Sequence, residues 1–112
     1  MPDVRVKRVY EPAERGDGRR VLIDRLWPRG LAKDAVPLDW WCKDLAPSAE
    51  LRKWYGHDPD KFAEFAERYR AELAGATDAL DDLRSTRGRL TLLTATRDVE
   101  HSNAAVLAEL LG

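Results

Sequence analysis

Two short apolar runs, Val21-Leu22-Ile23 and Leu90-Thr91-Leu92-Leu93-Thr94, decide the fold of this chain. Each run is bounded by turn signals, which is typical of short strands that are buried on both faces of a sheet. The residues between the runs show helical spacing, so the chain leaves one strand, forms helices and returns to another strand. This order predicts an α/β fold with a mostly parallel sheet.

A third strand is predicted over residues 4–9, where valines alternate with basic residues as in a half-exposed strand. Residues 11–20 join this strand to the run at 21–23, and their proline and glycines indicate a loop. A link of ten residues is short for a crossover between parallel strands, so two alternatives stay open. The first strand is either parallel to the second or its hairpin partner.

Helices are expected between and after the two apolar runs, because start signals and helical spacing recur there. The expected start signals are Ser48, Asp58 followed by Pro59, and Thr77, and a last helix carries Ala104, Leu107, Leu110 and Leu111. Gly56 and Gly75 are placed to end the first two helices. We expect the second helix to pack on the sheet through contacts of Phe62, Phe65 and Tyr69 with Leu22 or Leu92.

The length and composition indicate one domain that spans residues 1–112. A chain of 112 residues buries roughly 65% of its unfolded surface, so one hydrophobic core suffices. Cys42 is the only cysteine, which excludes an internal disulfide and fits a reducing compartment. No stretch approaches the ~20 apolar residues of a membrane span, and residues 1–20 lack a secretory signal. We therefore predict a cytoplasmic protein without a membrane partner, built on a three-stranded or slightly larger sheet with flanking helices.

The formal net charge of −1 hides an uneven distribution along the chain. Residues 1–34 hold nine basic and six acidic side chains, whereas residues 35–112 hold ten basic and 14 acidic ones. This balance leaves room for a local cationic pocket near the first strands. It makes nucleic acid an unlikely partner, and the predicted helix at 59–74 lacks the basic face of a recognition helix.

Three arginines follow the predicted strands at the edge where ligands bind in open α/β sheets. Arg25 and Arg29 come after the second strand, and Arg97 comes after the last one. A guanidinium forms paired hydrogen bonds with phosphate or carboxylate, so these arginines predict an anion site. The alternative is that Arg25 forms a structural ion pair with an aspartate such as Asp24, Asp44 or Asp98.

His57 and His101 are the only histidines, and either could transfer a proton near neutral pH. His101 lies close in sequence to Glu100 and Asp98, whose carboxylates could set its tautomer. The alternative is that each histidine only fixes the start of a helix. If the site is catalytic, we expect His101 to act with Asp98 or Asp24.

Two aromatic residues are placed to contact a ligand at the same edge of the sheet. Tyr10 ends the first strand, and Trp27 lies between Arg25 and Arg29, where its indole could stack on a flat ligand. The alternative for Trp27 is a place in the core. Cys42 is adjacent to Trp40 and Trp41, so we expect it to be buried and inert.

Several stretches resemble the YeaO-like family, a bacterial family numbered 488 among the domains of unknown function. They are Arg8-Val9-Tyr10, residues 21–30, 43–48 and 51–57, Arg97-Asp98 and Glu100-His101. The similarity covers nearly the whole chain. It implies a small α/β protein without an assigned activity.

The leading hypothesis is a small enzyme or enzyme-like domain that binds an anionic molecule, phosphorylated or nucleotide-like, in an Arg/Trp/His pocket. The expected catalytic residues are His101, Asp98 and Asp24, and the expected ligand-binding residues are Tyr10, Arg25, Trp27, Arg29, Arg97 and His57. No cofactor or metal is predicted, because paired-ligand spacings such as H-E-x-x-H are missing. A second hypothesis is a non-catalytic ligand sensor or protein-interaction module. A third, disfavoured hypothesis is a DNA-binding regulator.

Overall fold

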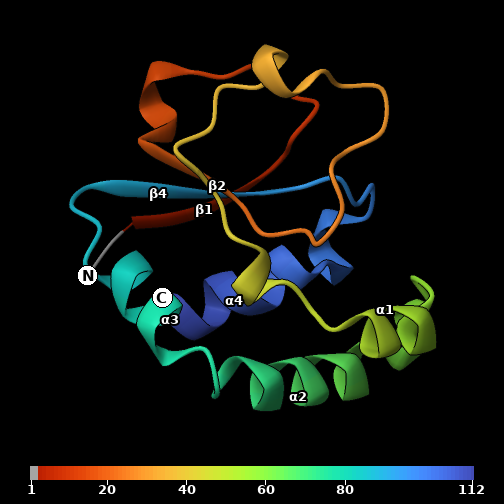
Figure 1. The fold of residues 1–112 in the computed structure, drawn as a ribbon. Helices are drawn as coiled ribbons and strands as arrows, with labels where there is room; N and C mark the ends of the chain where they lie inside the picture. The colour runs from red at the N-terminus through yellow and green to blue at the C-terminus, as the bar shows by residue number, and fades with distance from the viewer. Residues whose placement is uncertain (1–2) are drawn as a thin grey trace.

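Four parallel strands form one sheet in the computed structural model, which describes residues 3–112 (Figure 1). The strands are β1 (Asp3–Arg8), β2 (Arg19–Leu22), β3 (Trp40–Trp41) and β4 (Arg89–Thr94), and their spatial order is β1-β4-β2-β3. The predicted α/β fold with a mostly parallel, slightly larger sheet is therefore confirmed. β3 was not predicted from the sequence, because a strand of two residues has no periodicity.

β1 is parallel to its neighbour β4 and does not touch β2, so the hairpin alternative is wrong. β4 lies between these two strands, and the link between them therefore has to return along the sheet. Ten residues reach at most about 33–36 Å, whereas a strand of six residues is about 20 Å long. The link is therefore long enough, and a short helical turn at Arg15–Asp17 lies within it.

Three α-helices lie between β3 and β4 and a fourth follows β4, which is the order that the sequence predicts. They are α1 (Ala49–Tyr55), α2 (Phe62–Leu73), α3 (Thr77–Arg84) and α4 (Asn103–Leu111). The Ser48 hydroxyl accepts a hydrogen bond from the Leu51 amide, as a cap should, and Gly56 ends α1. Thr77 is not a cap but the first residue of α3, so that prediction is wrong. In residues 3–112, no helix is long and apolar enough to cross a membrane.

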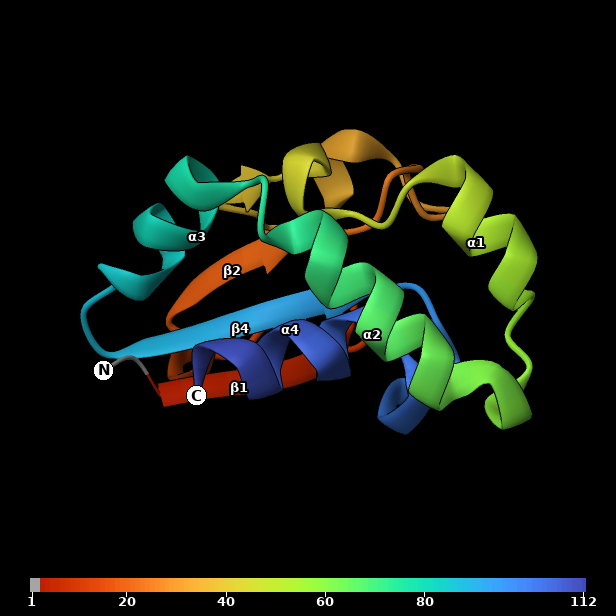
Figure 2. The ribbon, with the colours of Figure 1, turned by 90° about the horizontal axis from the view of Figure 1, so that it is seen from below.

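The helices cover one face of the sheet, as the two perpendicular views show (Figures 1 and 2). Phe65 and Tyr69 of α2 are buried in the same main core as Leu92 of β4, and α2 itself packs mainly against α4 and α1. Phe62 is only partly buried. Leu22 belongs to the other face, because successive strand residues point to opposite sides.

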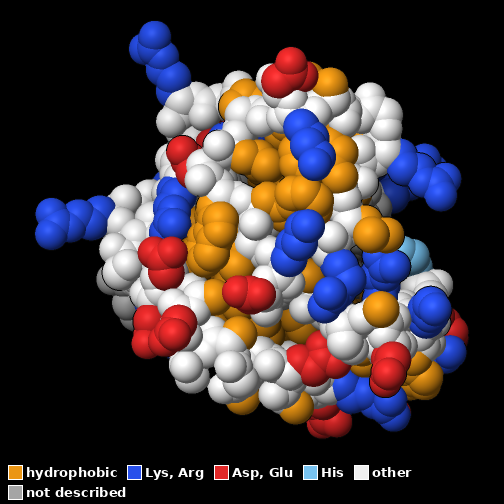
Figure 3. All heavy atoms as spheres, viewed as in Figure 1, with side chains coloured by type: hydrophobic (Ala, Val, Ile, Leu, Met, Phe, Trp, Pro, Cys, Tyr) orange, Lys and Arg blue, Asp and Glu red, His pale blue; other side chains and the backbone are white. Residues whose placement is uncertain are grey.

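The second face of the sheet is covered by loops that contain short 3-10 turns, at Arg15–Asp17 and Lys33–Ala35, and by none of the four α-helices (Figure 1). Leu22, Leu93 and Val36 belong to a small core there, and Trp27 and Trp41 pack against it. The two indole rings meet edge to face, with their centroids 5.1 Å apart. Hydrophobic side chains lie in the middle of this view of the molecule (Figure 3). The segment from β2 to β3 therefore contributes to the core of the protein, and it also carries polar residues that are predicted to bind a ligand.

Cys42 is 2% exposed and lies in the main core, as the sequence suggests. Burial raises the pKa of its thiol. A raised pKa keeps the sulfur in its less nucleophilic, protonated form.

Candidate functional site

A cavity of about 760 Å³ lies at the carboxyl ends of the strands, between the strand ends, α1 and the start of α4. This is the edge at which ligands bind in parallel α/β sheets. The residues predicted as site residues that line this cavity are Tyr10, Asp24, Arg25, Trp27, Arg29, His57, Arg97, Asp98 and His101. The fold thus brings all of them to one place, and their roles remain predictions.

Five cationic side chains line the cavity, because α1 adds Arg52 and Lys53 to the three predicted arginines. Arg25 donates a hydrogen bond to the Pro47 carbonyl at 3.4 Å. Within the described part of the chain, none of the five forms an ion pair. Lys and Arg side chains gather around a histidine at this edge of the molecule (Figure 3). The cavity therefore concentrates positive charge that its two carboxylates, Asp24 and Asp98, offset only in part.

Asp24 is a partly buried carboxylate on the cavity wall, and neutral groups hold it in place. It accepts hydrogen bonds from the Ala95 amide at 2.7 Å, the Thr94 hydroxyl at 3.0 Å and the Asn103 side-chain amide at 3.3 Å. Burial raises the pKa of the Asp24 carboxyl, and these hydrogen bonds and the charge of Arg52 offset only part of that effect. Asp24 therefore holds a proton more readily than an exposed aspartate.

His101 and Asp98 form a hydrogen-bonded pair in which Nδ1 lies 2.8 Å from the Asp98 carboxylate. The Tyr55 hydroxyl donates to the His101 carbonyl at 2.7 Å, and the Phe62 ring meets the imidazole edge to face. These contacts fix the ring. Because Asp98 engages Nδ1, the other ring nitrogen, Nε2, is left for a partner outside the pair.

Tyr10 and Trp27 provide aromatic surface in the cavity. Tyr10 is 41% exposed, its hydroxyl donates to the Arg29 carbonyl at 2.9 Å, and the Arg8 guanidinium lies 4.9 Å from its ring centre. Trp27 donates its indole N–H to the Leu31 carbonyl at 2.7 Å and packs on Trp41. Trp27 thus contributes to the small core and also lines the cavity. Its stacking on a ligand stays a prediction.

His57 has a backbone φ of 58°, the only positive φ of a non-glycine residue in the described chain. This left-handed conformation is strained for a residue with a Cβ atom. His57 directly follows Gly56, which ends α1 in the same conformation. This histidine lines the cavity.

Sequence reasoning missed the contributions of Arg52, Lys53, Thr96 and Asn103 to the cavity wall. Arg52 and Lys53 lie in α1. The apolar residues of this helix predict that it packs on the core, and they do not indicate which of its polar residues face a cavity. One signal could have pointed to them, since they lie within five residues of His57. Asn103 carries a weaker signal, a polar residue at the start of a very apolar helix.

Among residues 3–112, no group of three or more His, Cys, Asp or Glu side chains is arranged to hold a metal ion. Asp24, Asp98 and His101 at the cavity are each hydrogen-bonded to neighbours within the chain. Arginine, lysine and aromatic groups suit an organic or inorganic anion better than a cation. The lining therefore supports anion chemistry.

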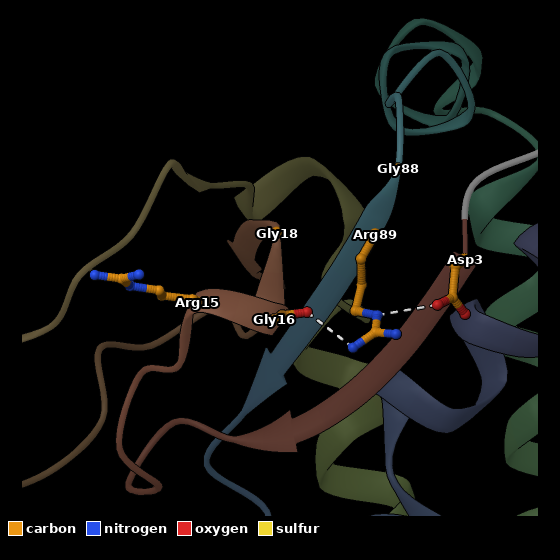
Figure 4. Close-up of a pocket in the computed structure, with 6 residues that line it drawn as sticks. All are labelled: Asp3, Arg15, Gly16, Gly18, Gly88 and Arg89. Carbon is orange, nitrogen blue, oxygen red and sulfur yellow. Dashed lines mark hydrogen bonds and ion pairs between the residues drawn. The ribbon is translucent and has the colours of Figure 1, made fainter.

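A second hollow, of about 510 Å³, lies near the start of β1 and β4 and differs in its use of charge (Figure 4). Arg89 donates to Asp3 at 2.9 Å and to the Gly16 carbonyl at 2.9 Å, and Arg15 points away from both (Figure 4). Gly18 is needed here, because a Cβ atom would lie 2.2 Å from the Arg89 carbonyl oxygen. The Arg89 guanidinium of this hollow thus stabilises the fold through contacts within the chain.

Comparisons with known proteins agree with the resemblance seen in the sequence. A family described as "Inactive DUF488-N3 subclade" matches residues 3–112. Uncharacterized proteins of Mycobacterium tuberculosis and Mycobacterium bovis are each 56% identical to the chain over 110 residues, covering 96% of it and 92% of the relative. The uncharacterized protein YeaO of Escherichia coli is 43% identical over 112 residues, covering 97% of this chain and 96% of YeaO. No solved structure matches. The chain therefore belongs to the DUF488 family, in the subclade described as inactive DUF488-N3.

Proposed function

We propose that this protein binds an anionic small molecule, phosphorylated or nucleotide-like, in the cavity at the carboxyl ends of its strands. One observation carries the proposal: five cationic side chains line one cavity and none of them forms an ion pair within residues 3–112. Like charges that gather in one place repel each other, and a bound anion relieves that repulsion.

The aromatic side chains support a ligand with a flat part. Tyr10 is exposed, and Trp27 lines the cavity between the arginines of the same loop. An aromatic ring next to a guanidinium suits a base or another flat group that is attached to a phosphate. A nucleotide combines both features.

We also propose a cytoplasmic setting, because a reducing compartment suits the free thiol of Cys42.

We propose binding without turnover as the main activity. The family description calls this subclade inactive, and that wording favours a ligand sensor over an enzyme. The His101 and Asp98 pair supports the second candidate, proton transfer to or from the bound molecule. Product formation from a panel of phosphorylated metabolites, lost in a His101→Ala variant, would establish that second candidate.

Thermal unfolding in the presence of anions tests the proposal. Phosphate or a nucleotide at a hundredfold excess over its dissociation constant should stabilise the folded chain by roughly 2.7 kcal/mol. Chloride at matched ionic strength is the control for general salt effects. In Arg29→Ala the anion-specific shift should disappear, because the exposed Arg29 side chain lines the cavity and forms no ion pair within residues 3–112.

Arg87→Ala is the matched control variant, since Arg87 is an exposed arginine between α3 and β4 and does not line the cavity. It removes the same charge and should keep the full phosphate response. Equal phosphate responses in the parent, Arg29→Ala and Arg87→Ala would disprove an anion site at these residues.

A further inference from the structure

The cavity has two chemically different parts. Four of its five cations are exposed, whereas Asp24 is partly buried and tied to the buried residues Thr94 and Asn103. These four cations lie toward the solvent and the carboxylate lies toward the protein interior. A ligand that fills the cavity therefore meets four exposed cations and Asp98 on its solvent side, and Asp24 with the partly buried Arg52 on its inner side.

The hydrogen bonds of Asp24 show what its carboxylate can still accept. Its two oxygens receive three neutral donors, from Thr94, Ala95 and Asn103; the Thr94 hydroxyl lies 3.0 and 3.3 Å from the two oxygens but has a single proton to donate. In the described chain no cation lies within ion-pair distance of them. An ionised carboxylate offers about four acceptor sites. At least one site therefore remains, and Asp24 is part of the cavity wall.

We propose that Asp24 determines which anionic ligands the cavity accepts: those whose inner end carries an N–H donor. This inference rests on the proposed function. The carboxylate repels a second anionic group at the inner end of the ligand. A group that only accepts hydrogen bonds leaves the remaining acceptor site of Asp24 without a donor. The ligand class is therefore a phosphate or carboxylate compound with an amino-substituted flat part, as in an aminopurine nucleotide.

Matched nucleotides test the selectivity without changing the protein. Adenosine 5′-monophosphate has an exocyclic amino group, purine riboside 5′-monophosphate has a hydrogen atom in its place, and the N6,N6-dimethyl derivative has the nitrogen without its donors. The dissociation constants can be measured by calorimetry. Adenosine 5′-monophosphate should bind at least about tenfold more tightly than either analogue, the loss typical of a hydrogen bond to a charged group.

Asp24→Asn assigns the selectivity to one side chain. It keeps the shape of the carboxyl group, so the preference for the amino group should fall below about twofold while inorganic phosphate still binds. Asp44→Asn is the matched control, since Asp44 is exposed and lies outside the cavity, and it should keep the preference.

The outcomes separate this inference from the proposed function. If phosphate binds and Arg29→Ala abolishes its binding, but the three nucleotides bind equally or Asp24→Asn keeps the preference, only the role of Asp24 is disproved. If the parent binds neither phosphate nor nucleotide, both proposals are wrong. If Asp24→Asn does not fold, the dimethyl derivative decides, because equal binding of it and the parent nucleotide overturns the inference.

Discussion

Two carboxylates flank β2, and the chain treats them in opposite ways. Asp17, just before the strand, is 5% exposed and forms ion pairs with Lys7 at 3.0 Å and with Arg20. Burial alone would raise the pKa of the Asp17 carboxyl, but the Glu14 amide and the two cations outweigh it and lower the pKa. Asp24, just after the strand, has only neutral hydrogen-bond donors, and its pKa is raised.

The difference separates charge that holds the fold from charge that is free to act. The Asp17 cluster ties the link between β1 and β2 to the second face of the sheet, where the Thr91 hydroxyl also donates to the Asp17 carbonyl. Its cations have their partners within the chain. At the carboxyl ends of the strands, Asp24 forms no ion pair with cavity cations such as Arg25 and Arg29, and these two form no ion pair within residues 3–112. Unsatisfied groups of this kind are typical of binding sites.

The largest expected effect is the loss of the Asp17 cluster. Asp17→Asn leaves Arg20, which is 7% exposed, without a counter-charge and leaves Lys7, which is 15% exposed, with only the exposed Glu14 at 3.3 Å, so it should cost about 3–5 kcal/mol of folding free energy. Urea denaturation at pH 7 measures the change. Asp81→Asn is the control, because its pair with Arg84 is exposed and should contribute under about 1 kcal/mol. A loss below 1 kcal/mol in Asp17→Asn would show that this cluster is not structural.

The pH dependence of stability should have opposite signs for the two carboxylates. The pKa of Asp17 is lowered on folding, so its stabilisation is present above the ordinary aspartate pKa and is lost as the pH falls through the folded value. The pKa of Asp24 is raised, so its contribution is fully present below the ordinary pKa and is lost as the pH rises through the folded value.

Two asparagine variants measure this difference from pH 7 down to the lowest pH at which the chain stays folded. At pH 7, Asp24→Asn should lie within about 1 kcal/mol of the parent, because it loses hydrogen bonds but also removes a poorly compensated charge. On acidification, the penalty of Asp17→Asn should shrink, whereas Asp24→Asn should become less stable relative to the parent. Parallel curves for the two variants would contradict the contrast between the carboxylates.

The sequence carries enough information for three of the four strands and for one side of the cavity. The apolar runs at 21–23 and 90–94 identify two parallel strands, and polar residues after such strands come together because parallel strands end at one edge. The contribution of Arg52 and Asn103 could not be read in this way. Which face of a helix meets a cavity depends on how the helix packs, and this information is not local.

The smallest expected effect concerns the backbone strain at His57. Its φ of 58° costs about 1–2 kcal/mol for a residue with a Cβ atom, whereas glycine takes this conformation freely but loses more chain entropy on folding. His57→Gly should therefore stabilise the protein by about 0.5–1 kcal/mol in urea denaturation. If the imidazole contacts the ligand, the same variant should bind phosphate more weakly, because strain kept at a site usually serves its function. His57→Ala separates the two effects, since it removes the ring but keeps the strain and should weaken binding without a gain in stability. A glycine variant that is less stable than the parent would show that the left-handed backbone is not strained, and the contrast between the two sides of the molecule would then rest on charge alone.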